Sequence, residues 1–215
     1  SFGALAHVRY VLSRTLGYKV KIGHAGTLDP LATGVLILCT GKATKRIEEF
    51  QGQTKEYTAT LQLGATTASY DMEHEVNASF PTEHITRELI NDTMPQFIGD
   101  IEQIPPTYSA VKVNGDRAYE LRRAGEEVKL KPKHIHIDEI EVVDFDVEKM
   151  QLSLRVVCGK GTYIRALARD LGRALNSGAY LTALRRTRVG DFTIDRCLDY
   201  EHIREWIESV SYTHL

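Results

Sequence analysis

The sequence is poor in the residues and runs that mark several large classes of protein. Three cysteines occur in 215 residues, and no two of them stand at Cys-x-x-Cys spacing. The odd number favours free thiols in a reducing compartment, and hence a cytoplasmic protein, over a disulfide framework. No apolar run approaches the roughly 20 residues of a membrane span. The eight histidines are scattered, and none stands with cysteines at the spacing of metal ligands.

An excess of basic charge is also lacking. The chain carries 29 acidic and 27 basic residues, which gives a formal net charge of −2. Proteins that bind nucleic acid are often basic overall, so this balance argues mildly against such a partner, although local clusters can still form a basic face. The most basic stretch holds Arg117, Arg122, Arg123, Lys129, Lys131, Lys133 and His134.

The apolar pattern alternates single helices with strands. The length allows one large domain or two small ones, and we see no repeat and no linker. We expect helices over residues 1–16, 42–50, 86–97, 116–124 and 162–175, with a last one after Asp199. Strands are expected over residues 20–22, 34–40, 55–63, 109–113, 135–145, 151–158 and within 179–194, and a polar loop over 65–81. This order predicts an α+β fold around a largely antiparallel sheet.

The glycine-rich segment GHAGTLDPLATG, residues 23–34, is the first candidate for chemistry. It lacks the Gly-Lys-Ser/Thr element of a phosphate loop, and it precedes a strand rather than a helix, unlike a dinucleotide fingerprint. Asp29 stands beside a rigid proline and between apolar neighbours. Local chemistry leaves two interpretations with about equal weight: a functional carboxylate, or the capping acid of an Asp-Pro turn.

A resemblance to a known family decides between these interpretations. GHAGTLDPLATGVLILCTGKATK resembles the motif of the TruB family of tRNA pseudouridine synthases. Further similar segments follow in the family's order and cover nearly the whole chain: KEYTATLQLGATTASYD, GDIEQIPPTYSAVKVNGDRAYELRRAGEEV, CGKGTYIRALARDLG and YLTALRRTRVGDF. The resemblance implies one catalytic domain over residues 1–215 that isomerises a T-loop uridine of tRNA to pseudouridine. It implies no metal and no cofactor, because the reaction involves neither redox chemistry nor hydrolysis.

The resemblance also implies three catalytic residues. Asp29 matches the family's essential aspartate, which attacks the base, attacks C1′ or removes a sugar proton. Arg165 matches the arginine that pairs with that aspartate, and such a pair keeps the carboxylate ionised. Tyr57 matches a tyrosine that stacks on the uracil. Taken alone, Arg165 would be an exposed helix arginine and Tyr57 a core residue.

Four further residues are implied to bind the substrate. Tyr163 and Leu184 match residues that line the base pocket, although without that match core packing would be favoured by roughly two to one. His24 matches a histidine that fills the space left by the extruded base, and the plain alternative is a hydrogen-bonded structural histidine. Lys19 belongs to a set of cations that could track RNA phosphates or simply be solvated: Lys19, Lys21, Lys42, Lys45, Arg46, Arg185, Arg186 and Arg188. The family's RNA-gripping insertion corresponds to residues 105–134, which we expect to be mobile.

The chain departs from the family pattern in places. The family's strand ahead of Ser1 is absent, which suggests a truncation, and nothing after Trp206 could encode the PUA domain of many members. Leu31-Ala32 stands where RNA-guided relatives carry a Lys-Val-type pair, which favours a bacterial, stand-alone enzyme without a guide RNA. We further expect a monomer. Two alternatives stay open. One is a non-catalytic tRNA-folding factor that binds the tRNA elbow, and the other is a sugar-cleaving enzyme, for which no second carboxylate stands out.

Overall fold

The computed structural model describes residues 1–109, 112–113, 116–118, 120 and 130–211. They fall into two compact units: unit 1 is Ser1–Lys55 with Arg186–Leu215, and unit 2 is Glu56–Arg185. The predicted α+β fold with a largely antiparallel sheet is confirmed. No helix of the described part is long and apolar enough to cross a membrane.

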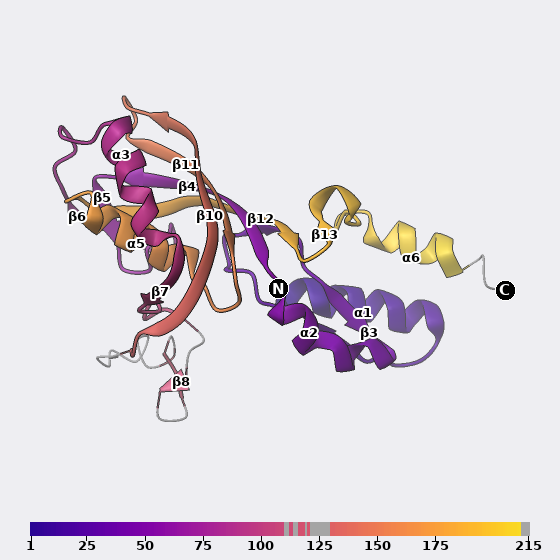
Figure 1. Cartoon of the computed structure of the whole chain (residues 1–215). Coiled ribbons are helices and arrows are strands. Elements are labelled where there is room, and N and C mark those ends of the chain that lie inside the picture. The colour runs from indigo at the N-terminus through magenta and orange to yellow at the C-terminus, as the bar shows by residue number, and fades with distance from the viewer. Residues whose placement is uncertain (110–111, 114–115, 119, 121–129, 212–215) are drawn as a thin grey trace. The chain divides into compact units, whose positions relative to one another are not determined.

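Unit 2 is built on a sheet with helices against it (Figure 1). The strand order is β12 (Ala179–Val189), β4 (Lys55–Leu63), β11 (Gln151–Cys158), β10 (Lys133–Asp146) and β7 (Gly99–Gln103). Helix α3 (Arg87–Thr93), the 3-10 helix η2 (Met94–Phe97) and helix α5 (Ile164–Ala174) share one apolar core with these strands. A separate hairpin joins β5 (Ala65–Thr67) to β6 (Val76–Ser79).

The core of unit 2 follows from the predicted alternation. Ala59, Leu61 and Leu63 of β4 are buried at every second position, as a strand with one covered face requires. Leu154 of β11 and Leu171 of α5 meet in the same cluster. Each such side chain contributes about 1.5–3 kcal/mol by leaving water, so this core holds α5 firmly against the sheet.

Most elements of unit 2 were predicted, but strand β7 and the hairpin of β5 with β6 were not. The hairpin expected over 135–145 and 151–158 is confirmed as antiparallel β10 and β11. The helix expected over 86–97 is present, although it tightens into η2 where Pro95 lies in the first turn. The loop expected over 65–81 is wrong in part, because it contains β5 and β6. These strands are short and their side chains mostly polar, so apolar periodicity gave no signal for them.

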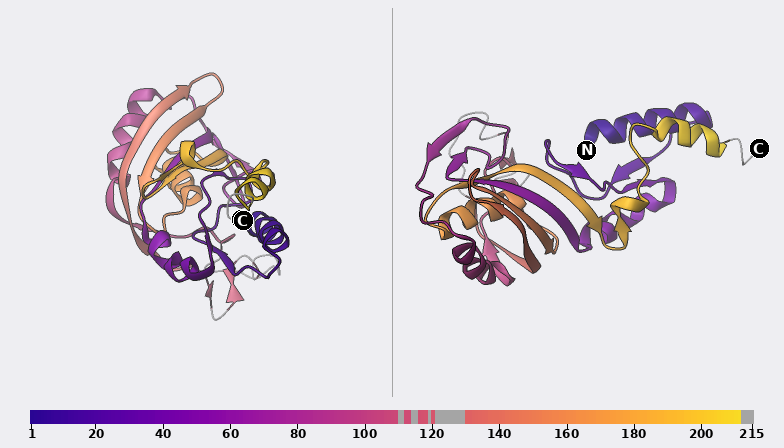
Figure 2. Two further views of the ribbon diagram at one scale, coloured as in Figure 1. Left: turned by 90° about the vertical axis from the view of Figure 1, so that its right-hand side faces the viewer. Right: turned by 90° about the horizontal axis from the view of Figure 1, so that it is seen from above.

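Unit 1 contains the two chain ends. Helix α6 (Ile203–Ser211) lies beside helix α1 (Phe2–Leu16) (Figures 1 and 2), where Val8, Val11 and Ile207 form a small core. Strand β1 (Ile22–His24) pairs antiparallel with β3 (Leu38–Thr40). The chain then forms η1 (Gly41–Arg46) and α2 (Ile47–Gly52). Strands β2 (Thr33–Gly34) and β13 (Phe192–Thr193) both pair with β12, and η3 (Ile194–Arg196) follows β13.

Two predictions for unit 1 need refinement. The helix over residues 1–16 is confirmed and ends at Gly17 in the left-handed conformation, with φ 73°. Ser1 precedes it, but its hydroxyl accepts a hydrogen bond from the Leu28 N–H at 2.8 Å instead of capping the helix. The single strand expected over residues 34–40 is interrupted. Gly34 has φ 106°, so β2 joins β12 while β3 joins β1.

The predicted RNA-gripping insertion is described only in part. Strands β8 (Lys112–Val113) and β9 (Asp116–Arg117) pair antiparallel. The expected strand over 109–113 is thus present at its end, whereas the helix expected from residue 116 is wrong at its start, because Asp116 and Arg117 belong to β9. The helix expected over 116–124 and the predicted mobility of this segment fall largely outside the described residues.

Candidate active site

Asp29 lies in the loop between β1 and β2 of unit 1, where it begins a tight turn. The Ala32 N–H donates to the Asp29 carbonyl at 3.0 Å, with Pro30 at the second position of the turn, which its fixed φ favours. The Asp-Pro turn that local chemistry suggested is therefore present in the backbone. The side chain is half-buried, and the Ser1 hydroxyl holds the neighbouring Leu28 N–H.

His24 ends β1 just before this loop. Its Nδ1 atom is buried and makes no hydrogen bond among the described residues, which speaks against the plain structural alternative. Burial, the N-terminal amino group and the Arg186 guanidinium all lower the pKa of His24. The lowered pKa favours the uncharged ring at neutral pH. Lys19 is exposed in the connection between α1 and β1.

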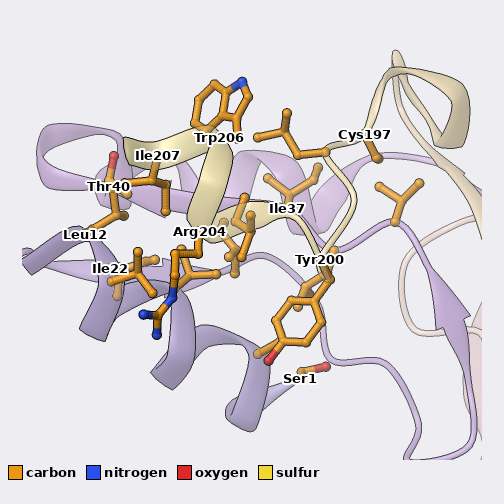
Figure 3. A pocket seen from close by; sticks show the side chains of 18 of the residues that line it. Ser1, Leu12, Ile22, Ile37, Thr40, Cys197, Tyr200, Arg204, Trp206 and Ile207 are labelled. Atoms are coloured by element: carbon orange, nitrogen blue, oxygen red, sulfur yellow. The ribbon is translucent and has the colours of Figure 1, made fainter. Parts of the chain in front are cut away.

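Asp29 also borders a large apolar pocket within unit 1. The pocket has a volume of about 1640 Å³ and is lined by α1, the loop, β3 and the segment that leads into α6. Figure 3 shows Leu12, Ile22, Ile37 and Ile207 among the side chains that surround it. Asp29 is thus one of the few charged residues that line a largely apolar pocket.

Arg165 stands in the first turn of α5 in unit 2 and is 3 % exposed. Its Nε lies 3.7 Å from Asp71 Oδ2, and its Nη1 donates to the Tyr108 carbonyl at 3.0 Å and the Ser69 carbonyl at 3.3 Å. A buried guanidinium held by one carboxylate and two carbonyls has a fixed direction. The exposed helix arginine that periodicity alone suggested is wrong.

The partners of Arg165 form a network of their own. Asp71 is 5 % exposed, and its Oδ1 accepts from the Ser69 hydroxyl at 2.5 Å and the Glu73 N–H at 3.0 Å. His74 Nδ1 lies 2.9 Å from the same hydroxyl, and the His74 ring packs on the Tyr108 ring at 4.6 Å. Sequence reasoning missed Ser69, Asp71 and His74, because they belong to the polar stretch over 65–81 that was expected to be a loop.

Three more predicted residues lie in unit 2. Tyr163 precedes α5, and its backbone is held twice by Gln103: the Tyr163 N–H donates to Gln103 Oε1 at 2.9 Å, and Gln103 Nε2 donates to the Tyr163 carbonyl at 3.2 Å. Gln103 is 2 % exposed, and no motif or periodicity pointed to it. Tyr57 of β4 and Leu184 of β12 are partly buried against the same core.

Unit 1 therefore holds Asp29, His24 and Lys19, while unit 2 holds Tyr57, Tyr163, Arg165 and Leu184. The ion pair described for Arg165 is with Asp71 of its own unit. The pairing of Asp29 with Arg165 stays a prediction. Among the described residues, no three His, Cys, Asp or Glu side chains gather as metal ligands would.

The predicted basic face needs one correction. Arg186 is 2 % exposed, and its guanidinium donates to protein carbonyls, so it does not face RNA phosphates as expected. Its burial follows from the pairing of β12 with β2. Lys42 and Lys45 of η1 are exposed, as predicted, while Arg46 is held by both oxygens of Glu49 at 2.7 and 2.9 Å.

Comparison with known proteins assigns the family. The family model described as TruB family pseudouridylate synthase (N terminal domain) matches residues 13–164, and that of the tRNA pseudouridylate synthase B C-terminal domain matches residues 165–213. The chain belongs to the TruB family. The two models together account for nearly all of it, so the resemblance of its motifs is confirmed.

Curated relatives and solved structures agree with membership of the TruB family. The chain is 64 % identical to tRNA pseudouridine synthase B of Bacteroides thetaiotaomicron over 97 % of its length and 88 % of that protein, and 50 % identical to the Flavobacterium johnsoniae enzyme of the same name over 97 % and 91 %. A Cbf5–Nop10–Gar1 complex contains a chain 29 % identical with TM-score 0.67 over 96 % of this chain. This chain spans about half of that one, 53 %.

Proposed function

We infer that the protein isomerises a uridine of tRNA to pseudouridine. The observation that carries this inference is the similarity to enzymes named tRNA pseudouridine synthase B, 64 % and 62 % identical over 97 % of the chain. The two TruB family models support it. In this reaction the C1′–N1 bond breaks and a C1′–C5 bond forms, while C5 loses its hydrogen as a proton and N1 gains one.

We propose that Asp29 supplies the essential carboxylate, together with Arg165 and Tyr57. Support for Asp29 comes from its place in a tight turn of the loop between β1 and β2, where its carbonyl accepts from the Ala32 N–H. Support for Arg165 comes from its burial and its three oxygen partners, which preorganise a positive charge. In this proposal, Tyr57, Tyr163 and Leu184 contact the base, and the uncharged His24 fills the gap left by its extrusion.

We propose further that the substrate is the T-arm of tRNA, bound by a monomer without a guide RNA. The high identity to bacterial enzymes supports this choice, whereas the similar chain in a solved H/ACA RNP bound to a substrate RNA is only 26 % identical. Exposed cations such as Lys19, Lys42 and Lys45 would contact phosphates.

The test follows the proton that leaves C5. A T-arm stem-loop labelled with tritium at uridine C5 is incubated with the purified protein, and released tritium is measured beside stem-loop binding. We expect release by the wild type and by Asp191→Asn, an exposed aspartate of the same unit, and none by Asp29→Asn. Binding without release by the wild type would instead favour the non-catalytic tRNA-folding factor. Normal release by Asp29→Asn would refute the role of Asp29.

A further inference from the structure

Arg186 connects the two ends of the loop that carries Asp29. Its Nε donates to the Val35 carbonyl at 2.8 Å, and its Nη2 donates to the Gly26 carbonyl at 3.1 Å. These carbonyls lie on opposite sides of Asp29 in the sequence. One buried side chain of unit 1 therefore spans the loop from its beginning to its end.

The backbone of Arg186 holds the same loop. Its carbonyl accepts from the Val35 N–H at 2.8 Å. The chain approaches so closely here that a Cβ on Gly34 would lie 2.1 Å from the Arg186 carbonyl oxygen. Gly34 at φ 106° is therefore required for this contact, since nothing larger fits. Backbone and side chain of one residue thus fix where the loop ends.

An arginine suits this arrangement for a specific reason. Its donors lie in a rigid plane and can reach two carbonyls at once, whereas a lysine offers one flexible ammonium group. Within the described residues, the recorded partners of its guanidinium are carbonyls and no carboxylate. Burying a positive charge without a carboxylate partner costs free energy of folding. Stability alone therefore gives little reason for a cation at this position. The charge also helps to lower the pKa of His24, after burial and the terminal amino group.

We propose that Arg186 is a positioning residue for pseudouridine formation. It sets the conformation of the loop that presents Asp29 and His24, and so governs the rate of the chemical step in bound RNA. A displacement of reacting groups by about 1 Å can cost about 100-fold in rate. The inference rests on the proposed function and extends it to a residue that contacts protein oxygens instead of substrate.

The experiment separates rate from binding. Single-turnover tritium release at saturating stem-loop and the dissociation constant of the stem-loop are measured for the wild type and Arg186→Lys. We expect Arg186→Lys to slow release by about 100-fold while the dissociation constant changes by less than about threefold. The matched control is Arg155→Lys in β11. This variant also replaces a hydrogen-bonded guanidinium, here bonded to Glu56 and Glu139, but Arg155 makes none of these bonds to the loop that carries Asp29. We expect it to release tritium at the wild-type rate.

Each result decides the matter. Folding is followed by circular dichroism, and rates are expressed per folded, RNA-binding molecule. A wild-type rate for Arg186→Lys overturns the proposal, as does weaker binding with an unchanged bound rate, which would make Arg186 a phosphate ligand. Complete loss of the fold would make it a structural residue only. An equally slow release by Arg155→Lys would show that the loss of rate comes from general destabilisation and not from the loop. Absence of release by the wild type would contradict the proposed function instead.

Discussion

At the scale of single residues, three buried arginines meet the cost of burial in different ways. Arg165 faces Asp71 of another element, Arg169 is bonded to both oxygens of its neighbour Asp170, and Arg186 donates to loop carbonyls. Burying a guanidinium without partners would cost several kcal/mol, so each set of partners is needed for folding. The direction in which Arg165 points is thus determined by Asp71, which sequence reasoning had placed in a loop.

Removing the charge of Asp71 should therefore be costly. Asp71→Asn leaves Arg165 buried beside a neutral amide, and we expect the free energy of unfolding to fall by about 3 kcal/mol. The matched control is Asp144→Asn, whose pair with Arg87 has the same length, 3.7 Å, but exposed side chains. We expect little change for this control, because exposed pairs are weak. Urea titration followed by circular dichroism measures both, and equal losses would contradict the role assigned to burial.

His24 makes the stability of unit 1 depend on pH. Its folded-state pKa is lowered, so the unfolded chain binds a proton that the folded chain resists. The stabilisation is complete above the ordinary pKa of about 6.5 and is lost as the pH falls below it. The fluorescence of the single tryptophan, Trp206 of unit 1, can follow thermal unfolding. We expect the melting temperature to fall as the pH is lowered. His24→Gln should flatten that fall, and an unchanged slope would refute the inference.

His136 makes the stability of unit 2 depend on pH in the opposite direction. A hydrogen bond to Asp100 raises the pKa of His136, so its stabilisation is present below the ordinary histidine pKa and is lost as the pH rises through the folded value. His136→Gln should therefore lower the melting midpoint of unit 2 on the acid side of about pH 6.5 and change it little at alkaline pH. Circular dichroism melts across this range measure it, and a larger loss at high pH would contradict the assignment.

At the scale of elements, the sequence predicts long periodic segments well and short polar ones poorly. Strand β4, the β10–β11 hairpin, α1 and α5 were predicted because apolar residues recur at strand or helix spacing. Strands β5 and β6 were missed, since their side chains give no apolar alternation. The break of residues 34–40 into β2 and β3 depends on the contact of Gly34 with Arg186, which is distant in sequence.

In the candidate site, likewise, the residues within recognisable motifs were predicted and their distant partners were not. Asp29, Arg165, Tyr57 and His24 were named from motifs, and their roles stay predictions. Gln103 and Asp71 escaped notice because each acts on a segment far along the chain. Gln103 is hydrogen-bonded to the backbone of Tyr163, and Asp71 forms an ion pair with Arg165. Such partners depend on tertiary packing, which local periodicity does not encode.

The contact of β2 with β12 can be tested through Gly34. Gly34→Ala would place a Cβ 2.1 Å from the Arg186 carbonyl, so the loop end must move. We expect a loss of stability greater than the roughly 1 kcal/mol of backbone strain, together with slower single-turnover tritium release. Gly99→Ala is the matched control, since Gly99 has a similar φ of 93° with nothing within 4 Å. Equal effects of both substitutions would show that strain alone, and no close contact, explains Gly34.

At the scale of the whole molecule, the net charge alone would not predict binding to RNA. The chain has a formal charge of −2, while its inferred substrate is a polyanion. Local clustering can reconcile the two, because η1 presents Lys42 and Lys45 to solvent, and carboxylates such as Glu201, Glu205 and Glu208 gather near the C-terminal helix. Binding should then depend on a few cations and on salt, whatever the total charge.

Salt dependence tests this distribution. If Lys42 and Lys45 each neutralise a phosphate, replacing both with Gln should reduce the slope of log binding constant against log salt by roughly 1–2. Single-turnover release at saturating stem-loop should stay unchanged, because the two lysines contact no reacting atom in this proposal. Lys149→Gln is the matched control, since Lys149 is exposed on the β10–β11 turn and paired with Asp146. An unchanged slope in the double variant would place the RNA path elsewhere, and a slower bound rate would make η1 part of the catalytic arrangement.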